Sequence, residues 1–194
     1  MRLFLILSIL CLTSCVETAV VAATAATGAV VAQERSAGQA VDDTAMFWEI
    51  KHLYLNKNAQ DLLAGVNVKV IEGRVHLTGK VDSAEARIDA VRLAWQPKGV
   101  KEVINDIEIN SKKTIKELFQ SNWIAGQVRT KILFAKDVKS VNYSIDVVEG
   151  VVYLMGIAQD AEELNKVTSL ASTVKGVKRV VSHVYFKNDP GRDV

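Results

Sequence analysis

The chain contains very little cysteine, histidine and proline. Of its 194 residues only two are cysteine, three are histidine and two are proline. Cys11 lies in an apolar N-terminal segment typical of a removed leader, so the mature chain keeps only Cys15 and builds no disulfide. No Cys/His set remains for a structural zinc site. We therefore expect no metal, no cofactor, and a fold held together by packed apolar cores alone.

An excess of one charge is also lacking. The formal net charge is +2, which is too small for a general nucleic-acid binder. The three histidines, His52, His76 and His183, are scattered and match no nucleophile or metal-ligand spacing. Strand alternation places His76 and His183 toward solvent. We expect no catalytic residue and interpret the chain as a non-enzyme.

The N-terminus reads as a secretory signal. Arg2 precedes an apolar run from Leu3 to Leu12. This run is shorter than the roughly 20 residues that span a bilayer, but it suits the apolar core of a signal peptide. A plain signal peptide with two incidental cysteines is one interpretation of this segment.

The residues that end this run indicate a lipid anchor. The sequence Leu-Thr-Ser-Cys at Cys15 resembles the lipobox of bacterial lipoproteins. In that class the leader is removed and the cysteine is acylated, so the resemblance implies a signal peptide over residues 1–14 and lipidation of Cys15. Val16, in place of Asp, is similar to the pattern of lipoproteins sent on to the outer membrane.

A low-complexity segment follows the cysteine. Val20 to Ala32 contains only Ala, Val, Thr and Gly, with no charge. Because it is short of a membrane span and rich in small residues, we expect a flexible lipidated tether over residues 15–42. Asp42, Asp43 and Thr44 then supply N-cap residues ahead of an apolar run, which predicts a helix start there.

The remainder of the chain is an internal repeat. Val70–Gly79 matches Val147–Gly156 at an offset of 77 residues, and Lys98–Lys101 matches Lys175–Lys178 at the same offset. An ungapped match over this distance predicts two similar small domains. The expected division is 43–110 for the first domain, 111–120 for a linker, 121–188 for the second domain and 189–194 for a flexible tail.

Each copy predicts the element order α-β-β-α-β. A helix is followed by two strands joined at a Glu-Gly turn, in which Gly73 or Gly150 takes the positive φ of a tight hairpin. A second helix and a third strand complete the unit, and parallel pairing of the last two strands favours a right-handed crossover. The fold class is therefore α+β, with a three-stranded mixed sheet covered by two helices in each domain. The helix core positions are Phe47, Ile50 and Tyr54 in the first copy and Ile124, Val128 and Ile132 in the second.

The repeated motifs resemble a known family. Gly-x-Val-x-Leu-x-Gly, then a helix, then Lys-Gly-Val-x-x-Val is similar to the BON domain, twice over, between Thr44 and Lys187. With the lipobox, the chain resembles the dual-BON outer-membrane lipoproteins. The resemblance implies a lipid-anchored protein that faces the periplasm and supports envelope integrity at division sites. It also implies phospholipid binding by the first helix of the second domain.

The charge distribution agrees with that implication. Nine basic and nine acidic residues balance between Thr44 and Asn110, whereas nine basic residues meet six acidic ones between Ser121 and Lys187. The helix predicted from Ser121 to Lys136 contains no acid. An aromatic side chain suits the membrane interface, and each Lys or Arg near an anionic surface contributes about 1 kcal/mol. The predicted phospholipid-binding residues are Trp123, Gln127, Arg129, Thr130, Lys131 and Phe134.

Two alternatives stay open at this point. Trp123 would instead pack into the core or between the domains if the basic residues only solvate a helix face. The rival function is an envelope scaffold whose chief ligand is a protein, such as a cell-wall hydrolase regulator or the outer-membrane assembly machinery. Nucleic acid is excluded as a partner by the expected location, and the packing of the two domains is not specified by the sequence.

Overall fold

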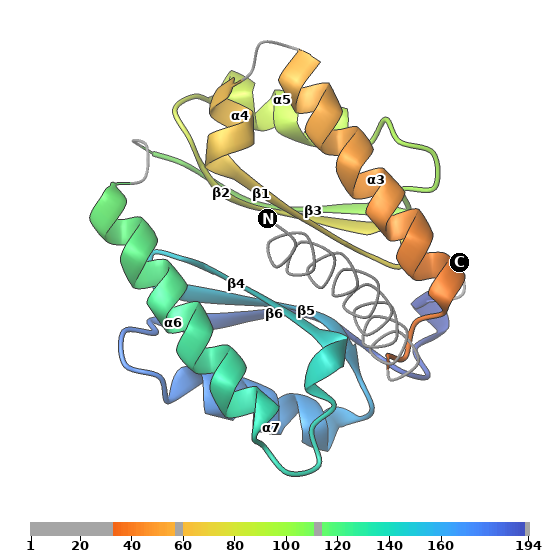
Figure 1. Ribbon diagram of the computed structural model, residues 1–194, viewed down its shortest axis with the longest axis vertical. Coiled ribbons are helices and arrows are strands. Elements are labelled where there is room, and N and C mark those ends of the chain that lie inside the picture. Colours follow the sequence, from red (N-terminus) through yellow and green to blue (C-terminus); the bar gives the residue numbers. More distant parts are fainter. Residues whose placement is uncertain (1–32, 57–59, 111–113, 193–194) are drawn as a thin grey trace, which may run out of the picture.

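The computed structural model describes residues 33–56, 60–110 and 114–192 (Figure 1). Cys15, the expected signal peptide and most of the expected tether lie outside the described residues. Within the described ranges, no helix has both the length and the apolar character needed to cross a membrane.

Two domains with the same element order make up the structure. The first contains α3 (Ala37–Asn56), α4 (Gln60–Gly65), β1 (Val66–Ile71), β2 (Arg74–Val81), α5 (Ala84–Ala94) and β3 (Glu102–Ile109). The second contains α6 (Ile115–Leu133), η1 (Ser140–Asn142), β4 (Tyr143–Val148), β5 (Val151–Ala158), α7 (Ala161–Ser172), β6 (Arg179–Phe186) and η2 (Pro190–Arg192). The predicted α-β-β-α-β order is confirmed, with α4 and the two short 3₁₀ turns as additions.

Both sheets have the predicted mixed topology. β2 pairs antiparallel with β1 and parallel with β3, and β5 pairs in the same way with β4 and β6. The parallel pair in each domain is connected through a helix, α5 or α7, which lies on one face of the sheet together with α3 or α6 (Figure 1). The apolar alternation of the strands therefore points toward the helices.

One apolar core forms between the helices and the sheet of each domain. Ile50 and Tyr54 of α3 are fully buried, and the Tyr54 hydroxyl donates a 3.0 Å hydrogen bond to the Ala90 carbonyl. Ile124, Val128 and Ile132 of α6 are buried in the core of the second domain. Burial of each such side chain contributes roughly 1.5–3 kcal/mol, so these cores stabilise the fold.

The hairpin turns follow from two successive residues with positive φ. Glu72 and Gly73 have φ of 56° and 77°, and Glu149 and Gly150 have φ of 49° and 84°. Two positive values define the tight turn that matches the twist of an antiparallel pair. In the first domain, the Asp43 carboxylate accepts hydrogen bonds from the Glu72 and Gly73 backbone amides, each at 2.9 Å.

The prediction that the first helix starts at Asp42–Thr44 is wrong, because α3 begins at Ala37. The Ser36 hydroxyl accepts from the Gln39 amide at 3.1 Å, and the Gln39 side chain accepts from the Ser36 amide at 2.9 Å. This reciprocal pair is a capping box, whose Ser-x-x-Gln signature precedes the acidic residues. Asp43 is instead a buried residue inside the helix, where it binds the hairpin turn.

The first helix of the second domain also starts earlier than predicted. α6 begins at Ile115, not at Ser121, because Thr114 and Glu117 form a second capping box. Residues 115–120, which we expected to belong to a linker, are therefore helical. At the other end of this domain, Arg192 lies in the segment expected to be a flexible tail, yet it donates to the Glu72 carboxylate at 2.7 and 2.9 Å.

Candidate functional site

The two sheets pack against each other through the faces that the helices leave uncovered (Figure 1). The central strand of each sheet is consequently buried on both sides. On this second face β2 carries Arg74, His76, Thr78 and Lys80, and β5 carries Tyr153, Met155 and Ile157, all of them buried. The sequence left this packing open, and the structure shows an interface that is polar on one side and largely apolar on the other.

Charged and polar pairs cross this interface. The Lys80 side chain is 2 % exposed, and its ammonium group contacts the Glu149 carboxylate, with Glu117 3.6 Å away. Asp146 accepts hydrogen bonds from the Thr78 hydroxyl and from the Asn67 amide, the latter at 2.9 Å. A buried charge is stabilised only when it is paired, so these contacts fix which surfaces meet.

Arg74 makes a second set of contacts across the interface. It donates to Glu102 of its own domain at 2.6 Å and to the His183 backbone carbonyl at 3.0 Å. Its guanidinium also lies 3.5 Å from the centre of the Tyr185 ring, a cation–π geometry.

The expectation that His76 and His183 face solvent is wrong for His76, which is 2 % exposed, and the His183 side chain is only 23 % exposed. Alternation correctly placed both on the face away from the helices, but the partner sheet covers that face. Both imidazoles bond Asp106, and the His76 ring packs 5.7 Å from the Tyr153 ring. Burial lowers the pKa of His76, an effect that the hydrogen bond to Asp106 opposes in part.

The predicted phospholipid-binding residues lie on α6, where four of the six share one exposed side. Trp123 is 53 % exposed and Phe134 is 81 % exposed, and Gln127 and Thr130 lie between them on that side at helical spacing. Phe119, one turn before Trp123, extends the exposed aromatic row. We call Phe119, Trp123, Gln127, Thr130 and Phe134 the α6 stripe. Trp123 is therefore not a core residue.

The two cations of the predicted set lie on the flanks of the α6 stripe. The Arg129 guanidinium donates to the Ile145 carbonyl of β4 at 2.8 Å. Lys131 donates to the Thr173 hydroxyl at the end of α7, at 2.7 Å. Both residues are exposed and keep their charge at the surface on either side of the aromatic row. Phe119 was not among the residues predicted to bind phospholipid, although its spacing of four residues from Trp123 was a signal.

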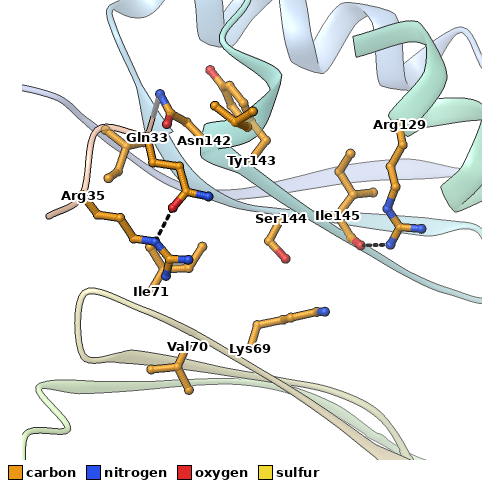
Figure 2. A pocket seen from close by; sticks show the side chains of 12 residues that line it. Gln33, Arg35, Lys69, Val70, Ile71, Arg129, Asn142, Tyr143, Ser144 and Ile145 are labelled. Atoms are coloured by element: carbon orange, nitrogen blue, oxygen red, sulfur yellow. Dashed lines mark hydrogen bonds between the residues drawn. The ribbon is translucent and has the colours of Figure 1, made fainter. Parts of the chain in front are cut away.

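Arg129 also lines a cavity of about 340 Å³ between β1 and β4 (Figure 2). Arg35 and Lys69 are the other cations of its wall, and within the described part of the chain no acidic side chain lines it. The Arg35 guanidinium bonds the Gln33 side chain at 2.7 Å and is paired with Asp43 at 2.8 Å. The cavity is thus a basic recess next to α6, built from both repeats and from the segment before α3.

The corresponding helix of the first domain differs in charge. α3 exposes Val41, Trp48 and Leu55 along one side, and Trp48 is 65 % exposed. Its sequence holds three acidic residues and one lysine, whereas α6 holds three basic residues and one acid. The two helices therefore offer apolar rows of similar kind in electrostatic surroundings of opposite sign.

Two α-β-β-α-β sandwiches paired sheet to sheet define a tandem repeat of one small α+β domain. The chain belongs to the BON family: the BON domain model matches residues 53–111 and 120–188. This confirms the resemblance seen in the repeat.

Several relatives match over most of the chain. An "Uncharacterized protein in gshII 5'region" of Anaplasma centrale is 44% identical over 150 residues, which cover 76% of this chain and 97% of that protein. "Outer membrane lipoprotein DolP" of Haemophilus influenzae is 28% identical over 164 residues, which cover 84% of this chain and 84% of that protein. A "21 kDa hemolysin" of Actinobacillus pleuropneumoniae is 29% identical and covers 78% of both.

Proposed function

We propose that the protein is a non-enzymatic outer-membrane lipoprotein, anchored at Cys15 and facing the periplasm, that binds anionic phospholipid through α6. The observation that carries this proposal is the exposed α6 stripe with Arg129 and Lys131 on its flanks. The relative named as an outer-membrane lipoprotein supports the location. By the family resemblance, the role is to support envelope integrity, with concentration at division sites.

The physical argument rests on the transfer of exposed aromatic side chains from water to the level of the lipid headgroups. Phe119, Trp123 and Phe134 keep most of their surface in water, and a row of this kind marks an interaction surface. Aromatic side chains are favoured at the level of lipid headgroups, where an apolar body and a polar edge are both satisfied. Each flanking cation adds about 1 kcal/mol near an anionic leaflet, so the affinity depends on lipid charge.

Vesicle co-sedimentation of residues 33–194 tests the proposal. This fragment keeps every described residue and lacks the acyl anchor, so binding reports on the folded part alone. We expect binding to vesicles rich in phosphatidylglycerol, weak binding to zwitterionic vesicles, and a decrease with added salt. Trp123→Glu places a charge in the stripe and is expected to weaken binding at least tenfold while the thermal unfolding midpoint stays unchanged.

Trp48→Glu is the matched control. Trp48 is also an exposed tryptophan, on the first helix of the other domain and in acidic surroundings, and its replacement is expected to leave vesicle binding within about twofold. Equal losses for the two variants would contradict the assignment to α6. Absence of binding to any vesicle, with a defined envelope protein crosslinked through α6, would favour the scaffold function instead.

A further inference from the structure

Three side chains with metal-binding chemistry converge where the sheets meet. His76 of β2, Asp106 of β3 and His183 of β6 each place one ligand atom within 4.8 Å of the other two. Both imidazole Nε2 atoms approach the same atom, Asp106 Oδ2, at 2.9 and 2.7 Å. We propose that these residues form a site for a divalent transition-metal ion of the zinc class, shared between the two domains.

The donor set and its spacing fit such an ion. Two imidazole nitrogens and one carboxylate oxygen are a typical set of three protein ligands, with a fourth position left for water. Tetrahedral bonds of about 2.0–2.2 Å place ligand atoms roughly 3.3 Å apart. The observed separations are a few tenths of an ångström shorter, and small rotations of Asp106 and His183 open them.

Access to the site comes from the same two residues. The side chains of Asp106 and His183 are 25 % and 23 % exposed, whereas that of His76 is 2 % exposed. The cluster therefore has one deep ligand and two ligands that reach the solvent edge of the interface. An ion would therefore enter from this edge, past Asp106 and His183.

Rigid strands hold the three positions. Thr78 is the partner of Asp106 in the parallel β2–β3 register, so Asp106 lies two residues along from the partner of His76 and on the same face. His183 pairs with Met155 in the other sheet and faces across the interface. Sites built on strands keep their geometry better than sites on loops, which favours ion binding without rearrangement of the backbone.

The surrounding charges leave the carboxylate for a cation to neutralise. Among the described residues, the ion pairs of Asp106 are with His76 and His183 only. Arg74 of β2 donates hydrogen bonds to the Glu102 carboxylate and to the His183 carbonyl, and Lys80 forms an ion pair with Glu149. Because neither cation pairs with Asp106, a bound divalent ion would supply the positive charge that neutralises this carboxylate.

Binding also has a structural consequence. Two ligands belong to the first domain and one to the second, so an ion that binds the paired domains stabilises their pairing. The gain grows with the logarithm of the ion concentration above the dissociation constant.

Metal titration of the full chain tests the proposal. The chain is purified in detergent without a histidine tag, stripped with a chelator, and titrated with Zn²⁺ by calorimetry and with Co²⁺ by visible absorption. We expect one ion per chain and the intense absorption of tetrahedral Co²⁺. His183→Gln keeps a donor toward Asp106 and removes the imidazole; it is expected to weaken binding more than about a hundredfold, since even the outer partners of ligands contribute about 10–100-fold.

His52→Gln is the matched control, because His52 is the remaining histidine of the chain and is exposed on α3. It is expected to bind Zn²⁺ like the unchanged chain. Circular dichroism establishes that both variants are folded, and Zn²⁺ is expected to raise the melting temperature of the unchanged chain but not of His183→Gln. Zinc binding that is absent, or that is equal in the His183→Gln variant, overturns the proposal and leaves the cluster as a hydrogen-bonded contact only.

Discussion

The two domains share one fold but carry different side chains on the faces that they turn to each other. On the helix side, Val75, Leu77 and Gly79 of β2 correspond to Val152, Leu154 and Gly156 of β5. On the interface side, Arg74, His76, Thr78 and Lys80 correspond to Val151, Tyr153, Met155 and Ile157. Core packing constrains the first set in the same way in both copies, whereas the second set has diverged into two different halves.

This divergence determines which domain pairs with which. Lys80 is buried against Glu149, whose repeat counterpart Glu72 binds Arg192 instead. Asp146, which accepts hydrogen bonds from Asn67 and Thr78, has Lys69 as its repeat counterpart, so a pairing of two first domains would lose this acceptor. The contrast between β2 and β5 therefore favours first-with-second pairing over either domain pairing with itself.

The largest expected effect tests whether the cores remain equivalent. A Cβ at Gly79 would lie 2.0 Å from the Gly65 carbonyl oxygen, and one at Gly156 would lie 2.0 Å from that of Asn142. Gly79→Ala and Gly156→Ala are each expected to lower the free energy of unfolding by about 4 kcal/mol or more, because a backbone oxygen cannot move aside cheaply.

Denaturant unfolding measures both variants of that pair. Gly126→Ala on α6 is their control, since its added methyl meets nothing within 4 Å and is expected to stabilise the helix by up to about 1 kcal/mol. A loss confined to one of the two strand variants would show that the cores are not equivalent.

The next effect concerns the charged half of the interface. Glu149→Ala removes the acid in contact with the buried Lys80 and leaves Glu117, 3.6 Å away, as its nearest ion-pair partner among the described residues. Removal of a partner from a fully buried pair costs about 3–5 kcal/mol, and the partial exposure of Glu149 reduces the expected loss to about 2 kcal/mol. Glu117→Gln, which removes the charge of the distant partner but keeps the capping box with Thr114, is expected to cost less than about 1 kcal/mol by the same unfolding measurement. A larger loss for Glu117→Gln would reverse our ranking of the two acids.

A smaller effect depends on pH. Side-chain hydrogen bonds from Lys139 and Lys187 lower the pKa of Glu34 to about 2. Because the folded-state pKa is below the ordinary value, this contribution is present above about pH 4.5 and is lost as the pH falls toward 2. Thermal melts between pH 7 and pH 2 are expected to show a shallower acid decline, on the order of 1 kcal/mol, for Glu34→Gln. Identical declines for the two proteins would contradict this role of Glu34.

The smallest effects separate lipid affinity from stability. Arg129→Ala and Lys131→Ala each remove one flanking charge of the α6 stripe, and each is expected to reduce binding to anionic vesicles about fivefold. Their unfolding free energies are expected to stay within about 0.5 kcal/mol of the unchanged protein, since both residues are exposed. Titration with vesicles of increasing anionic content measures the first quantity. A stability loss without an affinity loss would assign both residues to the fold.

The sequence predicted the interior of each domain well because local periodicity and turn chemistry decide it. The 77-residue offset, the Glu-Gly hairpins and core positions such as Tyr54 and Ile124 all depend on contacts within one repeat. The start of α3 was predicted too late because the acidic residues near Asp43 outweighed the capping-box signature at Ser36. Asp43 is a residue type that often caps helices, but here its carboxylate accepts a hydrogen bond from the Glu72 amide in the hairpin turn, which is a tertiary contact.

The interface and the histidine cluster were not predictable in the same way. Alternation along β2 shows that His76 lies on the face of the sheet opposite to that of Val75 and Leu77. It does not show what covers the His76 face. His76 and Asp106 belong to one repeat and His183 to the other, so their separation in the sequence follows no motif spacing. The cavity beside Arg129 is likewise assembled from Arg35, Lys69 and α6, which only the packing of the two domains brings together.

The contacts at the centre of the interface indicate how the two-domain arrangement arose. His76 packs on Tyr153, and Asp106 bonds His183; in each pair the partners occupy the same position in the two repeats. A residue meets its own counterpart only on a two-fold axis, as in a symmetric homodimer. The chain therefore has the arrangement of a dimer whose subunits have been fused. Covalent linkage makes the association intramolecular, with an effective concentration that does not depend on how much protein the cell makes. Freed from the need to be self-complementary, each half was able to change its own side of the contact.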